Sequence, residues 1–113
     1  MSDLDLYAVA DFCLIPMGIA ETSVAEYIAE CQRILEKSGL TFKMHGYGTN
    51  LEGKWSDVSK AIHDCHAAVH AKGAPRIATD IRIGTRTDRD IVHGTGNAGK
   101  VKRVEDILAK SAA

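Results

Sequence analysis

The sequence predicts an α+β domain with the element order strand, helix, strand, strand, helix, strand. This is the ferredoxin-like arrangement, in which an antiparallel sheet carries two helices on one face. Three observations predict it: a mostly apolar first strand, two amphipathic helical segments that each end at a glycine, and a long alternating strand after the second helix. An added helix is expected at the C-terminal end, and all 113 residues are expected to form this single domain.

The first strand is predicted over residues 6–15, where Asp11 is the one charged residue in an apolar run. Pro16 is expected to end the strand, because proline has no N–H to donate to a neighbouring strand. Even and odd positions point to opposite faces, and both sets are largely apolar. Both faces of this strand are therefore expected to be covered.

The first helix is predicted to begin at Val24, because Ser23 and Glu26 have the spacing of a capping box. Its end is expected at Ser38 and Gly39, where glycine accepts a left-handed conformation. The predicted core stripe of this helix consists of Val24, Tyr27, Ile28, Cys31, Ile34 and Leu35.

Two short strands are expected over residues 41–45 and 47–52, joined at Gly46. The second helix is predicted to end at Lys72 and Gly73, with a core stripe of Trp55, Val58, Ile62, Cys65 and Val69. A long strand over residues 76–86 alternates, with Ile77, Thr79, Ile81 and Ile83 toward the helices. A polar bend and a glycine-rich loop over residues 93–99 lead to a short helix with Val101, Val104, Ile107 and Leu108 inside.

The sheet face away from the helices is expected to mix apolar and charged side chains. The predicted interface residues on it are Val9, Asp11, Arg76, Asp80 and Arg82. Such a surface suits contact with another surface, most economically with a copy of itself. We therefore expect a homotetramer, with a homodimer as the alternative.

Composition disfavours several classes of protein. The formal net charge of -1 argues against a nucleic-acid or anionic-membrane partner. No apolar run approaches the roughly 20 residues that cross a bilayer, and the N-terminus lacks a basic stretch followed by an apolar one. Three widely spaced cysteines indicate small packing side chains rather than disulfides. A cytoplasmic location is expected.

Residues 94–100 satisfy both a dinucleotide-binding pattern and the first seven positions of a P-loop. Val101 stands where a P-loop needs Ser or Thr for magnesium, so nucleotide binding is disfavoured. The free N–H groups and Lys100 could still meet an anion at a helix N-terminus. His63, His66 and His70 lie on the flank of the second helix, and no metal site is expected. An enzyme that uses Cys65 and His66 is the least favoured alternative.

Residues 48–55 place a hydroxyl, an amide, a carboxylate and the only tryptophan close together in the sequence. Gly48 and Gly53 bracket these groups and let the backbone approach another surface closely. The segment could be a binding edge, or a tight connection between a strand and a helix.

Several motifs together resemble one known family over about residues 7–108. They are Ile15-Pro16-Met17-Gly18, Thr22-Ser23-Val24, residues 48–53 followed by Trp55, Arg76-Ile77, Arg86 with Asp88 and Arg89, and Gly99-Lys100-Val101 with Val104. In their order and spacing they resemble the YkoF-like thiamine-binding proteins.

This resemblance implies a ferredoxin-like domain that assembles through its sheets and binds thiamine or its hydroxymethylpyrimidine part. It implies a non-enzymatic binding protein without a cofactor. Such a ligand needs a flat surface, hydrogen-bonding groups and an acidic or aromatic neighbour for its cation. The candidate ligand residues are Ser23, Tyr47, Thr49, Asn50, Glu52 and Trp55. The alternative is a structural or protein-interaction module with no small-molecule ligand.

Overall fold

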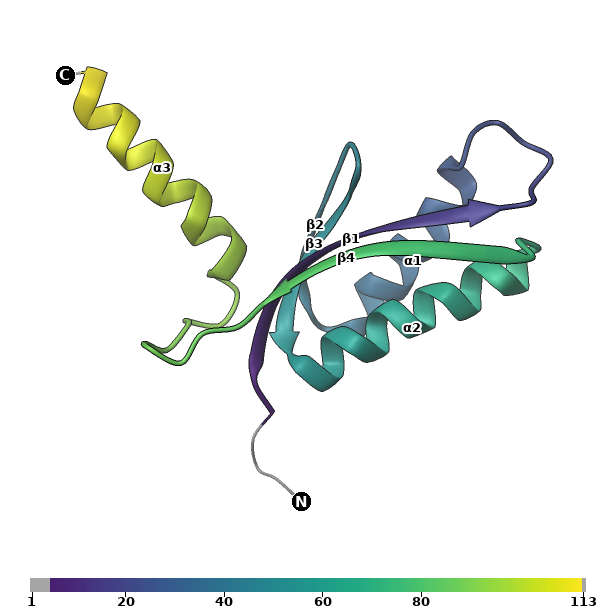
Figure 1. Ribbon diagram of the computed structural model, residues 1–113, viewed down its shortest axis with the longest axis horizontal. Helices are drawn as coiled ribbons and strands as arrows, with labels where there is room; N and C mark the ends of the chain where they lie inside the picture. Colours follow the sequence, from purple (N-terminus) through teal and green to yellow (C-terminus); the bar gives the residue numbers. More distant parts are fainter. Residues whose placement is uncertain (1–4, 113) are drawn as a thin grey trace.

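The computed structural model describes residues 5–112 and confirms the α+β architecture (Figure 1). Its strands are β1 (Tyr7–Met17), β2 (Thr41–His45), β3 (Gly48–Lys54) and β4 (Arg76–Gly84), and its helices are α1 (Ala25–Ser38), α2 (Trp55–Lys72) and α3 (Gly96–Ala112). The sheet is antiparallel with the strand order β2-β3-β1-β4. With α1 and α2 on one face, this is the predicted ferredoxin-like topology.

The core lies between the sheet and helices α1 and α2. Along β1 the even-numbered residues 8, 10, 12 and 14 are buried, while the odd-numbered residues from 7 to 13 are only half-buried. On the helical side, Cys31 and Leu35 of α1 and Val58 and Val69 of α2 complete the core. Within one chain, β1 is therefore fully covered on its helix face alone.

The prediction that Pro16 ends the first strand is wrong. β1 continues to Met17, and Pro16 pairs with Ile77 of β4. On its other side, β1 pairs with β3 only as far as Phe12 opposite Thr49. Pro16 therefore lies where one edge of β1 is open, so its missing N–H removes no sheet hydrogen bond on that side.

The predicted capping box is also absent from the described chain. The Ser23 hydroxyl accepts a hydrogen bond from the Ala25 N–H at 3.3 Å, and Val24 occupies the N-cap position without a side-chain cap bond. Glu26 instead lies 3.9 Å from Lys72 at the end of α2. Val24 is exposed, so the core stripe begins at Tyr27.

The predicted stripe of α2 is confirmed at Val58, Ile62, Cys65 and Val69, whereas Trp55 at the helix start is 43% exposed. On β4, the four residues expected to face the helices do share that face. Ile81 and Ile83 nevertheless remain exposed, because β4 is an edge strand. The strand ends at Gly84, two residues before the predicted end.

The C-terminal helix departs most from the prediction. α3 begins inside the expected loop, spans 17 residues and projects away from the rest of the domain (Figure 1). Its predicted inner residues Val101, Val104, Ile107 and Leu108 are 56–63% exposed. The Cα radius of gyration is 16.2 Å, whereas a compact domain of this length has about 13 Å. Helices α1 and α2 already fill the apolar face of the sheet, so α3 has no place there. None of the described helices is both long and apolar enough for a membrane span.

Candidate functional site

Strand β3 separates the predicted ligand residues instead of gathering them. Thr49 pairs with Phe12 and faces the helices, whereas Glu52 pairs with Val9 and faces the open side of the sheet. Asn50 lies on the same side as Glu52, because side chains alternate along a strand. Thr49 and Glu52 therefore belong to two different environments.

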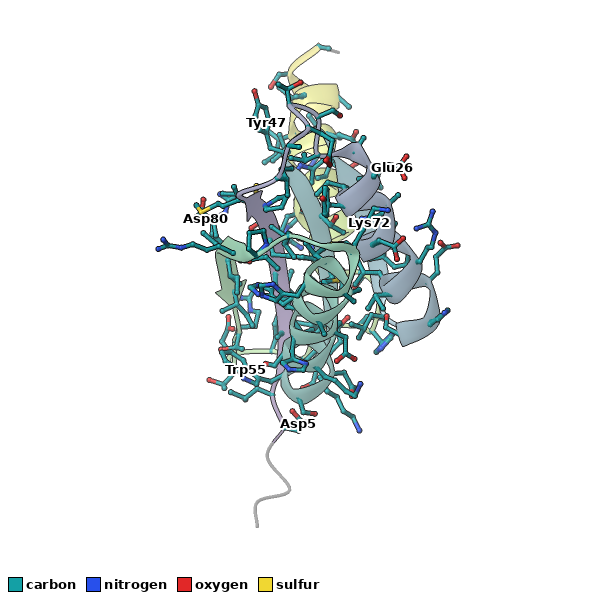
Figure 2. The ribbon with its side chains drawn as sticks, turned by 90° about the vertical axis from the view of Figure 1, so that its right-hand side faces the viewer. Asp5, Glu26, Tyr47, Trp55, Lys72 and Asp80 are labelled. Carbon is teal, nitrogen blue, oxygen red and sulfur yellow. The ribbon has the colours of Figure 1, made fainter. Side chains whose placement is uncertain are left out.

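The two predicted aromatic residues lie at opposite ends of β3 (Figure 2). Tyr47 is 89% exposed in the turn between β2 and β3. Trp55 is the first residue of α2, and its N–H donates to the Leu6 carbonyl at 2.7 Å. Ser23 is exposed in the segment before α1. Trp55 and Ser23 thus lie apart from the two cavities that the other predicted residues line.

The first of these, the α1 cavity, lies between β1, α1 and the β2–β3 turn. It has a volume of about 230 Å³ and is lined by Cys13, Ile15, Ile28, Gln32, Tyr47 and Thr49, among others. The cavity exists because β3 stops pairing with β1 at Phe12. The next residues of β1 therefore present an unpaired backbone edge.

A polar pair lines the α1 cavity. Gln32 Nε2 donates to Thr49 Oγ1 at 3.0 Å, and Thr49 is only 3% exposed. Within residues 5–112, neither the Thr49 hydroxyl hydrogen nor the Gln32 carboxamide oxygen has a further partner. The pair therefore offers the Thr49 hydroxyl hydrogen as a donor and the Gln32 carboxamide oxygen as an acceptor. The sequence reasoning missed Gln32, although its polar side chain stands beside Cys31 of the core stripe.

The second cavity, the α3 cleft, lies between the open face of β2 and β3 and the first half of α3. Its volume is about 860 Å³. Lys43, His45 and Asn50 line it from the sheet, and Asn97 and Val101 line it from α3.

Glu52 lies at the base of the α3 cleft and holds the start of α3. Its Oε2 accepts hydrogen bonds from the Tyr7 hydroxyl at 2.6 Å and the Gly96 N–H at 2.7 Å, and its Oε1 accepts from the Asn97 N–H at 3.0 Å. A carboxylate is favourable here because a helix N-terminus carries partial positive charge. Glu52 is 1% exposed, so the hydrogen bonds of its carboxylate are made within its own chain.

Two neighbouring groups complete this attachment. The Tyr7 hydroxyl accepts a hydrogen bond from the Gly94 N–H at 2.8 Å. Burial and the hydrogen bond to Glu52 raise the pKa of Tyr7 to about 12. A Cβ on Gly96 would overlap Val9 and lie 2.8 Å from Glu52 Oε2. The glycine-rich segment thus meets an anion at a helix N-terminus, but the anion is Glu52.

The five predicted interface residues share the open face of the sheet. Arg82 donates to both carboxylate oxygens of Asp11, at 2.9 and 2.8 Å, and these bonds lower the pKa of Asp11. Arg76 and Asp80 stand opposite Met17 and Cys13 on the same face. Figure 2 shows Asp80 on the side of the sheet away from α1 and α2.

Cys65 and His66 do not form a nucleophile and a base. Cys65 is buried with its sulfur 3.7 Å from the Cys31 carbonyl. The hydrogen bond with Cys31 and burial raise the pKa of the Cys65 thiol, which disfavours the reactive thiolate. His66 Nε2 lies 2.6 Å from Thr79 Oγ1. In the part of the chain described, no three His, Cys, Asp or Glu residues are grouped to hold a metal ion.

Comparison with known proteins identifies the family. A family model described as thiamine-binding protein matches residues 10–110. The chain belongs to this family. A UPF0045 protein from Synechocystis sp. is 48% identical to this family member over 103 residues, which cover 91% of the chain and 81% of the relative. The UPF0045 protein YqgV from Bacillus subtilis is 37% identical over 86 residues, covering 73% and 83%.

Solved structures support the fold of this thiamine-binding family member. Protein MJ1052 from Methanocaldococcus jannascii superposes with a TM-score of 0.75 at 25% identity, covering 88% of this chain and 96% of its own. A Thermotoga maritima protein proposed to act in thiamine biosynthesis or salvage has a TM-score of 0.68 at 12% identity, covering 84% and 98%.

Proposed function

We propose that this protein binds thiamine through its hydroxymethylpyrimidine ring in the α1 cavity, as a non-enzymatic homo-oligomer. Membership of the thiamine-binding protein family supports the ligand class. The observation that carries the choice of cavity is the hydrogen bond between buried Thr49 and half-buried Gln32, which leaves the Thr49 hydroxyl hydrogen and the Gln32 carboxamide oxygen available to a ligand.

The edge of an aminopyrimidine complements that pair. A ring nitrogen accepts a hydrogen bond beside an amino group that donates one. The Thr49 hydroxyl can donate to the nitrogen, and the Gln32 oxygen can accept from the amino group. Tyr47 offers an aromatic surface at the cavity wall. The volume of about 230 Å³ lies below the roughly 300–1,000 Å³ of sites for drug-sized ligands. The cavity therefore suits one ring, and the thiazolium part would extend toward solvent.

Calorimetric titration with thiamine and with hydroxymethylpyrimidine, on protein freed of retained ligand, tests this proposal. We expect Thr49→Val to abolish saturable binding, because it removes the hydroxyl and keeps the shape. The matched control is Thr41→Val, which makes the same change in the α3 cleft. If Thr41→Val abolishes binding and Thr49→Val does not, the ligand binds in the α3 cleft and not in the α1 cavity.

Thermal unfolding gives an independent readout. A ligand at about 100 times its dissociation constant stabilises the folded protein by roughly 2.7 kcal/mol. No heat and no thermal shift at millimolar ligand would overturn the proposed binding function.

The homo-oligomer, proposed as a tetramer, is supported by two uncovered surfaces, the open face of the sheet and the apolar stripe of α3. Val9 is a poor test position because it contacts Gly96, so a charge there would also disturb α3. Ile15 and Val104 are 38% and 56% exposed. We expect Ile15→Asp or Val104→Asp to split the oligomer, since a buried unpaired charge costs several kcal/mol. A wild-type monomer in light scattering at micromolar concentration would refute the assembly.

A protein-interaction module without a ligand is the second candidate. It is favoured by Glu52, whose carboxylate is buried and hydrogen-bonded within its own chain. A stable oligomer that binds neither ligand would establish this alternative. For either function we propose a cytoplasmic location, because Cys13, Cys31 and Cys65 are free thiols. Cell fractionation tests the location.

A further inference from the structure

A small basic cavity lies beside the first turns of α3. It has a volume of about 80 Å³, and four cationic side chains line it. These are Arg86, Arg89, Lys100 and Arg103, which come from the segment after β4 and from α3. Two further lining residues, Thr95 and Gly99, also line the α3 cleft, so the two cavities adjoin.

The positive charge of this basic cavity is only partly compensated. Arg86 donates to both carboxylate oxygens of Asp88, at 2.6 and 2.5 Å. Among residues 5–112, Arg89, Lys100 and Arg103 take part in no ion pair. Like charges repel, so three cations that form no ion pair around one small cavity favour the entry of an anion.

We propose that the basic cavity binds a phosphate group. Guanidinium groups match phosphate oxygens with paired hydrogen bonds, and a lysine adds a compact charge. A volume of about 80 Å³ is far below the roughly 300 Å³ at which sites for organic ligands begin. It suits one tetrahedral oxyanion. The phosphate is either inorganic or part of an ester whose organic group occupies the adjoining α3 cleft.

Titration with inorganic phosphate and with phenyl phosphate at low ionic strength tests the proposal. Lys100→Gln and Arg103→Gln each remove one positive charge from the basic cavity. Lys110→Gln removes the same charge from the far end of the same helix and is the matched control. We expect the dissociation constant to rise about tenfold or more in the first two variants, because each loses a charge-assisted hydrogen bond. It should stay near the wild-type value in the control.

The outcomes separate the two sources of phosphate. Tighter binding of phenyl phosphate than of inorganic phosphate indicates an ester, and equal binding indicates the free ion. Absence of saturable binding at millimolar phosphate would overturn the proposal, as would equal weakening in all three variants. If Arg103→Gln does not fold, the comparison of Lys100→Gln with Lys110→Gln still tests the proposal. Thr49→Val should leave phosphate binding unchanged, so failure here is distinguishable from failure of the proposed thiamine site.

Discussion

Replacement of Glu52 by glutamine is expected to release α3 from the sheet. The glutamine oxygen can take the place of Oε2 and accept from Tyr7 and Gly96. Its NH2 group then faces the N–H of Asn97, which donates to Oε1 in the wild type. The glutamine N–H and the Asn97 N–H would then face each other, and two hydrogen-bond donors cannot bond to one another. The Glu52→Gln variant therefore loses one charge-assisted hydrogen bond and the negative charge at the helix N-terminus.

The size of this loss follows from those two contributions. A hydrogen bond to a charged group contributes about 1.5–3 kcal/mol, and a charge at a helix N-terminus contributes about 0.3–1 kcal/mol. Their sum is about 2–4 kcal/mol, which raises the equilibrium constant for release of α3 about 30- to 700-fold. A lone helix is only marginally stable in water, so a released α3 unfolds.

Hydrogen exchange of the α3 amides measures this release directly. The control is Glu36→Gln, which makes the same change at an exposed position of α1. We expect faster exchange across α3 in Glu52→Gln only, with the amides of β1 and α2 close to wild type. Equal α3 exchange in the two variants would refute the role of Glu52 as the attachment of this helix.

Three further predictions concern two glycines of α3, Tyr7 and the cysteines. Gly96→Ala should weaken the attachment of α3, because the added Cβ would overlap Val9. At Gly99 an added Cβ meets no close contact, so Gly99→Ala should stabilise the helix by about 1 kcal/mol. Thermal denaturation of the two variants measures both effects. Burial and Glu52 raise the pKa of Tyr7 from 10.0 to about 12, so its contribution is complete below about pH 10 and is lost as pH rises through 12. Alkaline denaturation of Tyr7→Phe should lack that loss, and identical profiles would contradict it. A thiol reagent should label at most Cys13 in the folded protein, and mass-spectrometric detection of labelled Cys65 would show that the core opens.

The sequence predicted the sheet and its two covering helices because periodicity reports local structure directly. Alternation along β1 and β4, and the stripes of α1 and α2, correspond to the observed faces. Pro16 was misjudged because its effect depends on where β3 ends, which is a property of strand pairing.

The candidate site was harder to predict, since it depends on contacts between distant segments. Thr49 and Glu52 are three positions apart, and the strand turns them to opposite faces. Glu52 binds the backbone of Gly96 and Asn97, more than 40 residues away. The stripe of Val104 and Ile107 predicted a helix with a buried face, but both side chains are more than half exposed, because α1 and α2 already cover the apolar face of the sheet.

Because α3 is attached to the sheet at one end, a small rotation at that end produces a large displacement at the other. Its 17 residues span about 25 Å at 1.5 Å per residue, so a tilt of about 10° at Glu52 moves the far end by about 4 Å. That distance is comparable to the size of a side chain. A small rearrangement of Tyr7, Glu52 and the Gly94 turn would therefore be magnified along the helix and would displace the exposed side chain of Leu108.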